Sequence, residues 1–503
     1  MGRTAWVGLL LLVFQDNDAS PLRARVRVFD PEPRVLKGIG EPTVDLGARV
    51  NAVLQGPRPE GWRPTGIDRR FYLDICERIV KEAVRWVDDQ GRLIDPVLRK
   101  EVAQSTPRFV SSAALLLCFG RAPEVKEAAY RAMSSSCRRL ADPAVRSMSP
   151  DFWMRELATA YLAFETVADQ DRLRGWAADL ARVEPEKIYL QVRPDGTKLE
   201  TLHNWTVYAA AGEVLREAAG IQASGKFLWG KAFFDRYMAA QLGHFTSLGM
   251  YRDPGDPITY DITTRLQFAT ALALGGYDGE HREAIGELLR RGGLATLLFV
   301  SPQGFVPYGG RSSQFCFQEA IVSALCELEA RRHRKSDPAL AGAFKRQARL
   351  SALSMKRWML EMTPWRHLKN GFPPEARHGL DTYGEYSVYS LLISSFLGLA
   401  ALYADDTIEE APCPSERGGF VFELSPAFHK VFANCGRTYV EIDTNADPRY
   451  DAGGLGRFTR DGVPLELGLG MPFAPAAKKG QGTVLSMAPG VHPRRLRRRS
   501  APR

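Results

Sequence analysis

The sequence predicts a mainly α-helical protein in which hairpins of helices are followed by a short antiparallel β region. Three observations support this fold class. About a dozen segments between residues 67 and 410 carry apolar residues every three to four positions, the spacing of amphipathic helices. Short turns rich in glycine, proline and aspartate join them. The strand pattern of alternating apolar and polar residues becomes frequent only after residue 417.

Length and charge limit the organisation of the chain. Its 503 residues exceed what one hydrophobic core usually supports, so we expect one large repetitive domain and one smaller domain. A formal net charge of +9 favours an anionic partner. Part of this excess lies in residues 476–503, which we expect to form a disordered basic tail rather than a nucleic-acid site.

The N-terminus resembles a secretion signal. Arg3 precedes an apolar run from Ala5 to Phe14, which is too short to span a bilayer. We therefore expect residues 1–19 to be a signal peptide and the protein to be secreted or periplasmic, with a cytoplasmic location as the alternative. Residues 20–66 are rich in proline, glycine and arginine and are predicted to be an extended lead-in. No other segment is predicted to cross a membrane.

The helical domain is predicted to span residues 67–410. Asp68 can cap its first helix, in which Phe71, Ile75 and Ile79 share one face. Further helices are expected over 111–118, 122–140, 152–167, 172–183, 204–219, 226–242, 258–274, 281–292, 313–334, 338–362 and 383–403. No sequence repeat of fixed period is present, so a closed ring is favoured over an open solenoid. The predicted fold is an (α/α)6-type incomplete toroid, whose loops converge on a cleft at one end.

The β region is predicted to span residues 417–475, after a proline-rich link. Strand-like runs occur at 419–424, 428–434 and 437–443, and the turn at Cys435 and Gly436 makes the last two a hairpin. The glycine-rich segment 451–457 is expected to be a loop, and 465–469 one more strand. Seven cysteines show no metal-binding spacing, and most lie in apolar patterns, so we expect buried free thiols.

The strongest candidate for chemistry is the pair His203 and Asn204 at the start of a predicted helix. His203 could transfer protons, and Asn204 could donate hydrogen bonds to an oxyanion or carboxylate. The alternative is that His203 only caps the helix. The chain carries no GxGxxG motif after a strand, no Walker loop, no HExxH and no GxSxG, so nucleotide-binding and zinc-protease functions have no support.

A second candidate is the turn-rich loop that runs from Tyr251 to Arg265. It carries Asp253, and Tyr260 lies near its end. A nearby cation can lower the pKa of a phenol enough for proton transfer, and Arg265 could supply that cation or bind a substrate carboxylate. The alternative for each tyrosine is a structural role in the core.

Two later loop-to-helix entrances could contribute substrate-binding residues. One presents Arg311 and Gln314 after a glycine pair, and the other presents Glu385 before the last long helix. His429, on a predicted strand just after the helical domain, is a candidate third catalytic residue. The alternatives are helix capping or salt bridges for the first set, and a half-buried strand histidine for His429.

Together these residues resemble the alginate lyases and heparinase II/III-type polysaccharide lyases, which combine an α toroid with an antiparallel β region. His203 and Tyr260 are 57 residues apart, a spacing similar to that of the family's His/Asn and Tyr pair. Gly249-Met250-Tyr251 is similar to the family's Gly-x-Tyr loop. The family also places a histidine from the β domain in the cleft, where His429 could lie.

The resemblance implies β-elimination at a uronic acid of an acidic polysaccharide or oligosaccharide. Asn204, with Arg265 or Arg311, would neutralise the carboxylate; His203 or Tyr260 would remove the C5 proton, and Tyr260 would protonate the leaving oxygen. No cofactor or metal is implied, and the oligomeric state is left open. One alternative is a toroid glycoside hydrolase, of the glucuronidase or unsaturated-glucuronyl type, with Asp253 or Asp256 and Glu385 as acid and base. Another is a non-catalytic carbohydrate-binding scaffold.

Overall fold

The computed structural model describes residues 20–29, 33–36, 40, 44–192, 204–381, 383–424, 426–436, 438–445, 447, 450, 453–460 and 463. Four predictions lie outside these residues. They are the signal peptide 1–19, the catalytic role of His203, the strand 465–469 and the basic tail 476–503.

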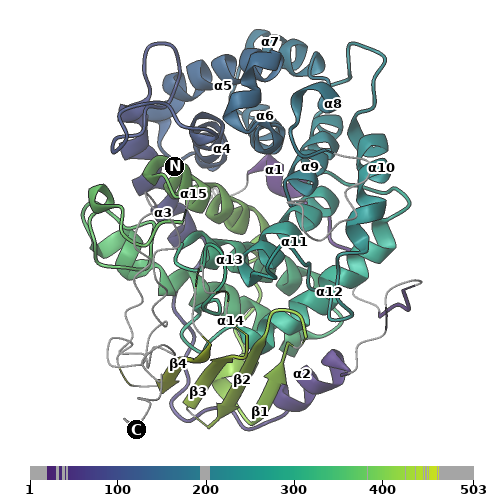
Figure 1. Ribbon diagram of the computed structural model, residues 1–503, viewed down its shortest axis with the longest axis vertical. Helices are drawn as coiled ribbons and strands as arrows, with labels where there is room; N and C mark the ends of the chain where they lie inside the picture. The colour runs from purple at the N-terminus through teal and green to yellow at the C-terminus, as the bar shows by residue number, and fades with distance from the viewer. Residues whose placement is uncertain are drawn as a thin grey trace, which may run out of the picture.

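Twelve helices of the described chain form two concentric rings (Figure 1). The inner ring consists of α4 (Ser105–Cys118), α6 (Trp153–Phe164), α9 (Asn204–Ala218), α11 (Ile258–Ala273), α13 (Phe317–His333) and α15 (Tyr386–Tyr403). The outer ring consists of α3 (Arg69–Ala83), α5 (Lys126–Leu140), α7 (Gln170–Ala181), α10 (Gly230–Leu242), α12 (Arg282–Phe299) and α14 (Pro338–Ser354). Each outer helix precedes an inner one, so six hairpins build the toroid and confirm the predicted fold class.

The inner ring is closed by its own contacts. Each inner helix packs against the next, and α15 packs against both α13 and α4. Every residue of α4 and α6 is buried, so these helices show little of the one-sided pattern of surface helices. Among the described helices, α15 is long and apolar enough to cross a membrane, with a mean hydropathy of 1.5, but 94% of it is buried. It is therefore a core helix of the ring.

Aspartate caps explain where several helices begin. The side chain of Asp68 accepts a hydrogen bond from the Arg70 amide at 2.8 Å, and Asp337 accepts one from Leu340 at 3.0 Å. Asp45 caps α2 (Leu46–Leu54) in the same way. This helix and the short α1 (Pro21–Ala24) correct the predicted extended lead-in. Two further short helices, α8 (Pro185–Ile188) and α16 (Pro414–Arg417), lie in connections.

The β region forms one antiparallel sheet in the order β1-β2-β3-β4. The strands are β1 (Phe420–Glu423), β2 (Lys430–Cys435), β3 (Thr438–Asp443) and β4 (Gly454–Arg460). The predicted hairpin at Cys435 is confirmed. The glycine-rich segment predicted to be a loop instead supplies β4, which pairs with β3 across an irregularity at Glu441 and Ile442. Six cysteines are buried free thiols as predicted, while Cys435 is exposed.

The sheet packs against the loop that follows α12. Tyr439 donates its hydroxyl to the carbonyl of Phe299 at 2.9 Å, and Glu441 accepts the Tyr308 amide at 2.7 Å. Figure 1 shows the sheet at the lower end of the molecule, and Arg49 of α2 donates to the carbonyl of Val421 in β1. Because Tyr308 lies three residues before Arg311, the sheet anchors the segment that brings Arg311 to the start of α13.

Candidate active site at the amino ends of the inner helices

Polar side chains gather where the inner helices begin. All six inner helices follow an outer helix of opposite direction, so their amino ends share one end of the ring. Five side chains are half-buried in this region: Trp205, Tyr260, Arg311, Asp381 and Tyr383. They come from four separate loop-to-helix entrances, which is where the sequence placed its candidates.

Asn204, Asp253 and Arg311 form one unit. The Asn204 side-chain amide donates to Oδ1 of Asp253 at 3.0 Å, and the guanidinium of Arg311 pairs with the other carboxylate oxygen. Asp253 is only 1% exposed. Burial lowers the pKa of Arg311, but the neighbouring Tyr260 and Asp253 raise it by more, so Arg311 stays charged. Both oxygens of the Asp253 carboxylate are therefore bound by side chains of the protein, Asn204 and Arg311.

Three hydroxyls meet beside this unit. The Tyr260 and Tyr383 hydroxyls lie 2.8 Å apart, and Ser312 Oγ lies 2.7 Å from Tyr383 and 3.2 Å from Tyr260. Asp381 accepts the Ser312 amide at 2.8 Å, and burial raises the pKa of Asp381 although that hydrogen bond lowers it in part. A protonated carboxyl group next to linked hydroxyls can deliver or collect a proton.

Tyr260 lies beside a cation, but this cation is Arg311. The Cζ of Arg311 is 4.1 Å from the centroid of the Tyr260 ring. Burial raises the pKa of Tyr260, and Arg311 offsets only part of that rise. The expectation of a lowered phenol pKa is therefore wrong in sign. A phenol that holds its proton suits an acid or a relay better than a base.

The structure places Tyr251 and Arg265 in the core instead of this cluster. Tyr251 is fully buried, and its hydroxyl donates to Gln241 at 2.5 Å. Arg265 is 1% exposed and makes two hydrogen bonds to Asp261, at 2.9 and 2.7 Å, plus one to Thr296. Their contacts brace the loop that carries the neighbouring site residues, so we assign both to the scaffold.

Gln314 and Glu385 lie at the two later entrances, as expected from the sequence. Gln314 is 6% exposed, and its backbone carbonyl accepts a hydrogen bond from the backbone amide of Lys369 at 2.8 Å. Glu385 is half-buried directly before α15, where Oε2 accepts the Gly384 amide at 3.2 Å. Burial raises the pKa of Tyr389, and the neighbouring Tyr260 and Glu385 raise it further, while Arg108 lowers it.

His429 lies in the connection between β1 and β2, half-buried, with a left-handed φ of 53°. Its carbonyl accepts the Thr444 amide at 2.8 Å. Within the described chain, no hydrogen bond or ion pair joins its imidazole to the hydroxyl cluster. Its catalytic role stays a prediction from the sequence.

Ser312, Asp381 and Tyr383 belong to the site but were not named individually as candidates, although they lie at the two later entrances that the sequence indicated. All three stand in glycine-containing loops directly before inner helices, and that position was the available signal. Ser312 also has a φ of 67°, an uncommon left-handed conformation for serine that places its amide against Asp381.

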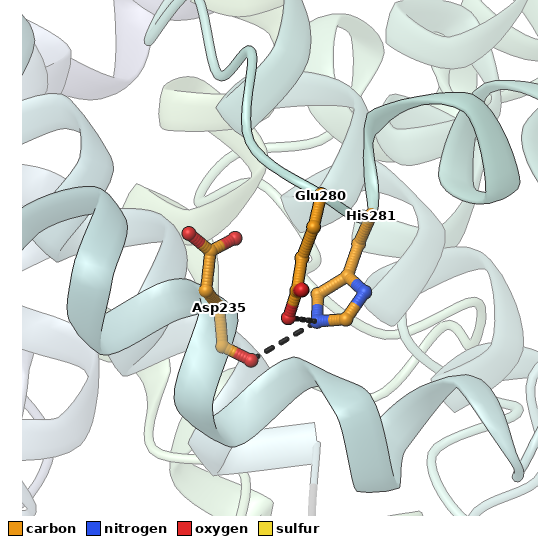
Figure 2. Close-up of side chains that lie close together, drawn as sticks. All are labelled: Asp235, Glu280 and His281. Carbon is orange, nitrogen blue, oxygen red and sulfur yellow. Dashed lines mark hydrogen bonds and ion pairs between the residues drawn. The ribbon is translucent and has the colours of Figure 1, made fainter.

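A separate polar cluster joins α10 to the start of α12 (Figure 2). One ligand atom from each of Asp235, Glu280 and His281 lies within 4.8 Å of the others, as in a cation site. The imidazole Nε2 is 3.0 Å from the Asp235 carbonyl oxygen and 3.2 Å from Glu280, and Asp235 accepts the Tyr277 hydroxyl. The polar groups of the cluster are hydrogen-bonded or ion-paired within the protein, and the Glu280 side chain is 68% exposed. These contacts explain the cluster as a structural link between the two helices, which we call the outer clamp.

No family model and no curated protein matches the sequence. Two solved structures of the unsaturated glucuronyl hydrolase from Streptococcus agalactiae are similar in structure. A mutant form of that enzyme gives a TM-score of 0.45 and 8% identity, covering 74% of this chain and 98% of that one. A second structure gives 0.42 and 9%, covering 74% and 99%. Similarity at this level carries no assignment of substrate or reaction.

Proposed function

We propose that this protein hydrolyses a glycosidic bond of a uronic-acid-containing carbohydrate, with Asp381 as the proton-transferring acid. One observation carries the proposal: Asp381 is a half-buried carboxyl group, its pKa is raised by burial, and the amide of Ser312 holds it beside the hydroxyl cluster. Glycoside hydrolysis needs a carboxylic acid that keeps its proton near neutral pH.

The second carboxylate of the pair is Glu385. It stands four residues after Asp381, in the same segment that leads into α15. Asp253 and Asp256, the other carboxylates considered from the sequence, are each engaged by an arginine. In this scheme Asp381 protonates the leaving oxygen as the glycosidic bond breaks. Glu385 accepts the proton of a water molecule as that water adds to the anomeric carbon.

The hydroxyl cluster and Asn204 would bind and orient the sugar. Tyr260 and Tyr383 retain their protons, so they can donate hydrogen bonds to ring or glycosidic oxygens. Half-buried Trp205, whose ring packs on Phe152 at 4.8 Å, offers an aromatic surface to a sugar face. Ser312 lies between the phenols and Asp381, since its Oγ hydrogen-bonds to Tyr383 and its backbone amide donates to Asp381. Glu385 then releases to solvent the proton that it took from water, and Asp381 regains a proton from solvent, so both groups return to their starting states.

A second candidate is β-elimination, the reaction that the lyase resemblance implies. The observation that favours it is the phenol pair, because two hydroxyls 2.8 Å apart next to Asn204 and Arg311 could protonate a leaving oxygen near a bound carboxylate. The base would be His203, which lies outside the described residues.

An assay on uronic-acid oligosaccharides separates the two reactions. Elimination creates an ultraviolet-absorbing double bond, whereas hydrolysis of a saturated substrate releases reducing ends without it, and hydrolysis of an unsaturated uronide removes existing absorbance. We expect hydrolysis, reduced about 10²–10⁴-fold in Asp381→Asn. Activity should decline as the pH rises through the raised pKa of Asp381, since the acid then loses its proton.

Matched controls come from the scaffold. Asp235→Asn removes a carboxylate, as Asp381→Asn does, but at the outer clamp between α10 and α12. Tyr251→Phe removes a phenol hydroxyl, as Tyr260→Phe does, but in the core. Both changes lie away from the hydroxyl cluster. New absorbance that Tyr260→Phe abolishes and Asp381→Asn spares would replace hydrolysis with elimination. No product from any uronide would reject both reactions in favour of a binding scaffold.

A further inference from the structure

Arg108 is a buried cation that the proposed reaction has not used. It lies in the first turn of the inner helix α4 and is only 3% exposed. Its NH1 group donates to the carbonyl of Val388 at 3.2 Å, and its Nε has no hydrogen-bond partner. Among the described residues, no carboxylate lies within 4 Å of its guanidinium.

The lack of a carboxylate distinguishes Arg108 from comparable residues. Every other described arginine or lysine that is at most 5% exposed has a carboxylate within 4 Å. Arg155, one helix away, pairs with Glu156 at 2.8 Å. An uncompensated charge in the interior is costly to the fold. Departures from this rule are expected at functional sites, so Arg108 is a candidate ligand-binding residue.

The surroundings of Arg108 connect it to the candidate active site. Its Cζ is 5.7 Å from the Tyr389 ring centroid and 5.9 Å from that of Phe152. Tyr389 stacks on Tyr383 at 5.9 Å, and Phe152 packs on Trp205. Arg108 therefore lies behind the aromatic rings that border the cluster, next to the neighbouring inner helices α6 and α15.

We infer that Arg108 binds the carboxylate of the substrate's uronic acid. The other arginine at the cluster, Arg311, is already neutralised by Asp253, so it adds little net charge for an anion. Arg108 supplies an uncompensated guanidinium where low local polarity strengthens a charge-assisted hydrogen bond. Half-buried Tyr389 and Trp205 can flank the sugar ring that carries the carboxylate. The inference rests on the proposed function for its class of substrate, an acidic carbohydrate.

Binding of a uronic acid to the full-length protein tests this role without turnover. The probes are D-glucuronate and its uncharged analogue D-glucuronamide, with calorimetry and ligand-induced shifts in melting temperature as readouts. We expect the wild type to prefer glucuronate by about tenfold or more. Arg108→Met should abolish the preference and Arg108→Lys should retain part of it. Arg252→Met, which removes a partly exposed arginine paired with Asp256, should leave it unchanged.

Stability provides an independent readout. Without ligand, Arg108→Met should melt at or above the wild-type temperature, because it removes a buried unpaired charge and keeps an unbranched apolar side chain. Equal binding of the two probes by the wild type, no binding of either, or a preference that persists in Arg108→Met would overturn the inference. A preference that depends on Arg108 in a protein that cleaves no glycoside would support it while rejecting the proposed function.

Discussion

The buried pair of Asp261 and Arg265 provides a direct test of how the loop at the site is held. Asp261 is fully buried and accepts three hydrogen bonds, two from Arg265 and one from the Tyr251 amide at 2.7 Å. Asp261→Asn keeps the shape and one acceptor but removes the charge. Arg265 then stays buried without a counter-charge, which costs about 3–5 kcal/mol.

The size of the effect can be expressed as a melting temperature. For a chain of 503 residues, the entropy of unfolding corresponds to roughly 1 °C for each kcal/mol, so we expect a decrease of about 3–5 °C. Scanning calorimetry on wild type and Asp261→Asn measures it. The double variant Asp261→Asn with Arg265→Met should recover part of the loss, because the unpaired charge is then gone.

Turnover distinguishes this structural role from substrate binding by Arg265. Well below the melting temperature, Asp261→Asn and the double variant should keep the wild-type KM, since neither residue reaches the hydroxyl cluster. A shift in melting temperature below about 1 °C for Asp261→Asn would refute the estimate for the buried pair. A raised KM in the double variant with no further loss of stability would return Arg265 to the substrate-binding set.

Three further predictions concern the scaffold. Burial raises the pKa of Glu441 from 4.5 to about 7. Between these two pH values the folded state keeps a proton that the unfolded state releases, so the free energy of unfolding should fall as the pH rises from 4.5 to 7. Urea titrations measure this dependence, and Glu441→Gln should flatten it. Gly249→Ala should destabilise the protein by about 2 kcal/mol or more in the same titrations, because φ is +71° and the new Cβ would lie 2.2 Å from the Leu288 carbonyl oxygen. Tyr251→Phe leaves Gln241 without its partner and should cost about 1–3 kcal/mol, measured by urea unfolding, with an unchanged KM.

The helices of the toroid could be predicted because their signals are local. Apolar spacing and capping aspartates such as Asp68 and Asp337 are contained within one or two turns of sequence. The inner helices are buried all round, yet flanking turns marked most of their limits to within a few residues. The exception is α4, which begins at Ser105, six residues before its predicted start. The ring closure of α15 on α4 rests on contacts between distant segments, and only the absence of a repeat pointed to it.

Two of the elements that the sequence analysis did not predict, α2 and β4, were missed for different physical reasons. The helix α2 carries Leu46, Val50 and Leu54 on one face behind the cap Asp45, but a short apolar stripe within a proline-rich segment is a weak signal. The strand β4 begins at Gly454, and glycine weakens strand propensity. Its pairing with β3 decides its conformation, and sequence-local preference does not contain that contact.

Within the site, the sequence located the entrances but not the direction of each side chain. Tyr251 and Tyr260 are nine residues apart in one loop, yet one hydroxyl ends on Gln241 in the core and the other on Tyr383 in the cluster. Arg108 has no distinctive motif around it. Its significance comes from the missing carboxylate, which only the packing of the surrounding inner helices reveals.

The aspartates of the segment that leads into α11 are each paired with an arginine. Three aspartates within nine residues, Asp253, Asp256 and Asp261, would make this segment an unfavourable neighbour for a polyanion if they were unpaired. In the structure each has its own arginine: Asp253 with Arg311, Asp256 with Arg252, and Asp261 with Arg265. The charges of these three aspartates are therefore compensated, and burial raises the pKa of Asp381. Arg108, which has no carboxylate partner among the described residues, adds a positive charge at this end of the ring, as its proposed role in binding a carboxylate requires.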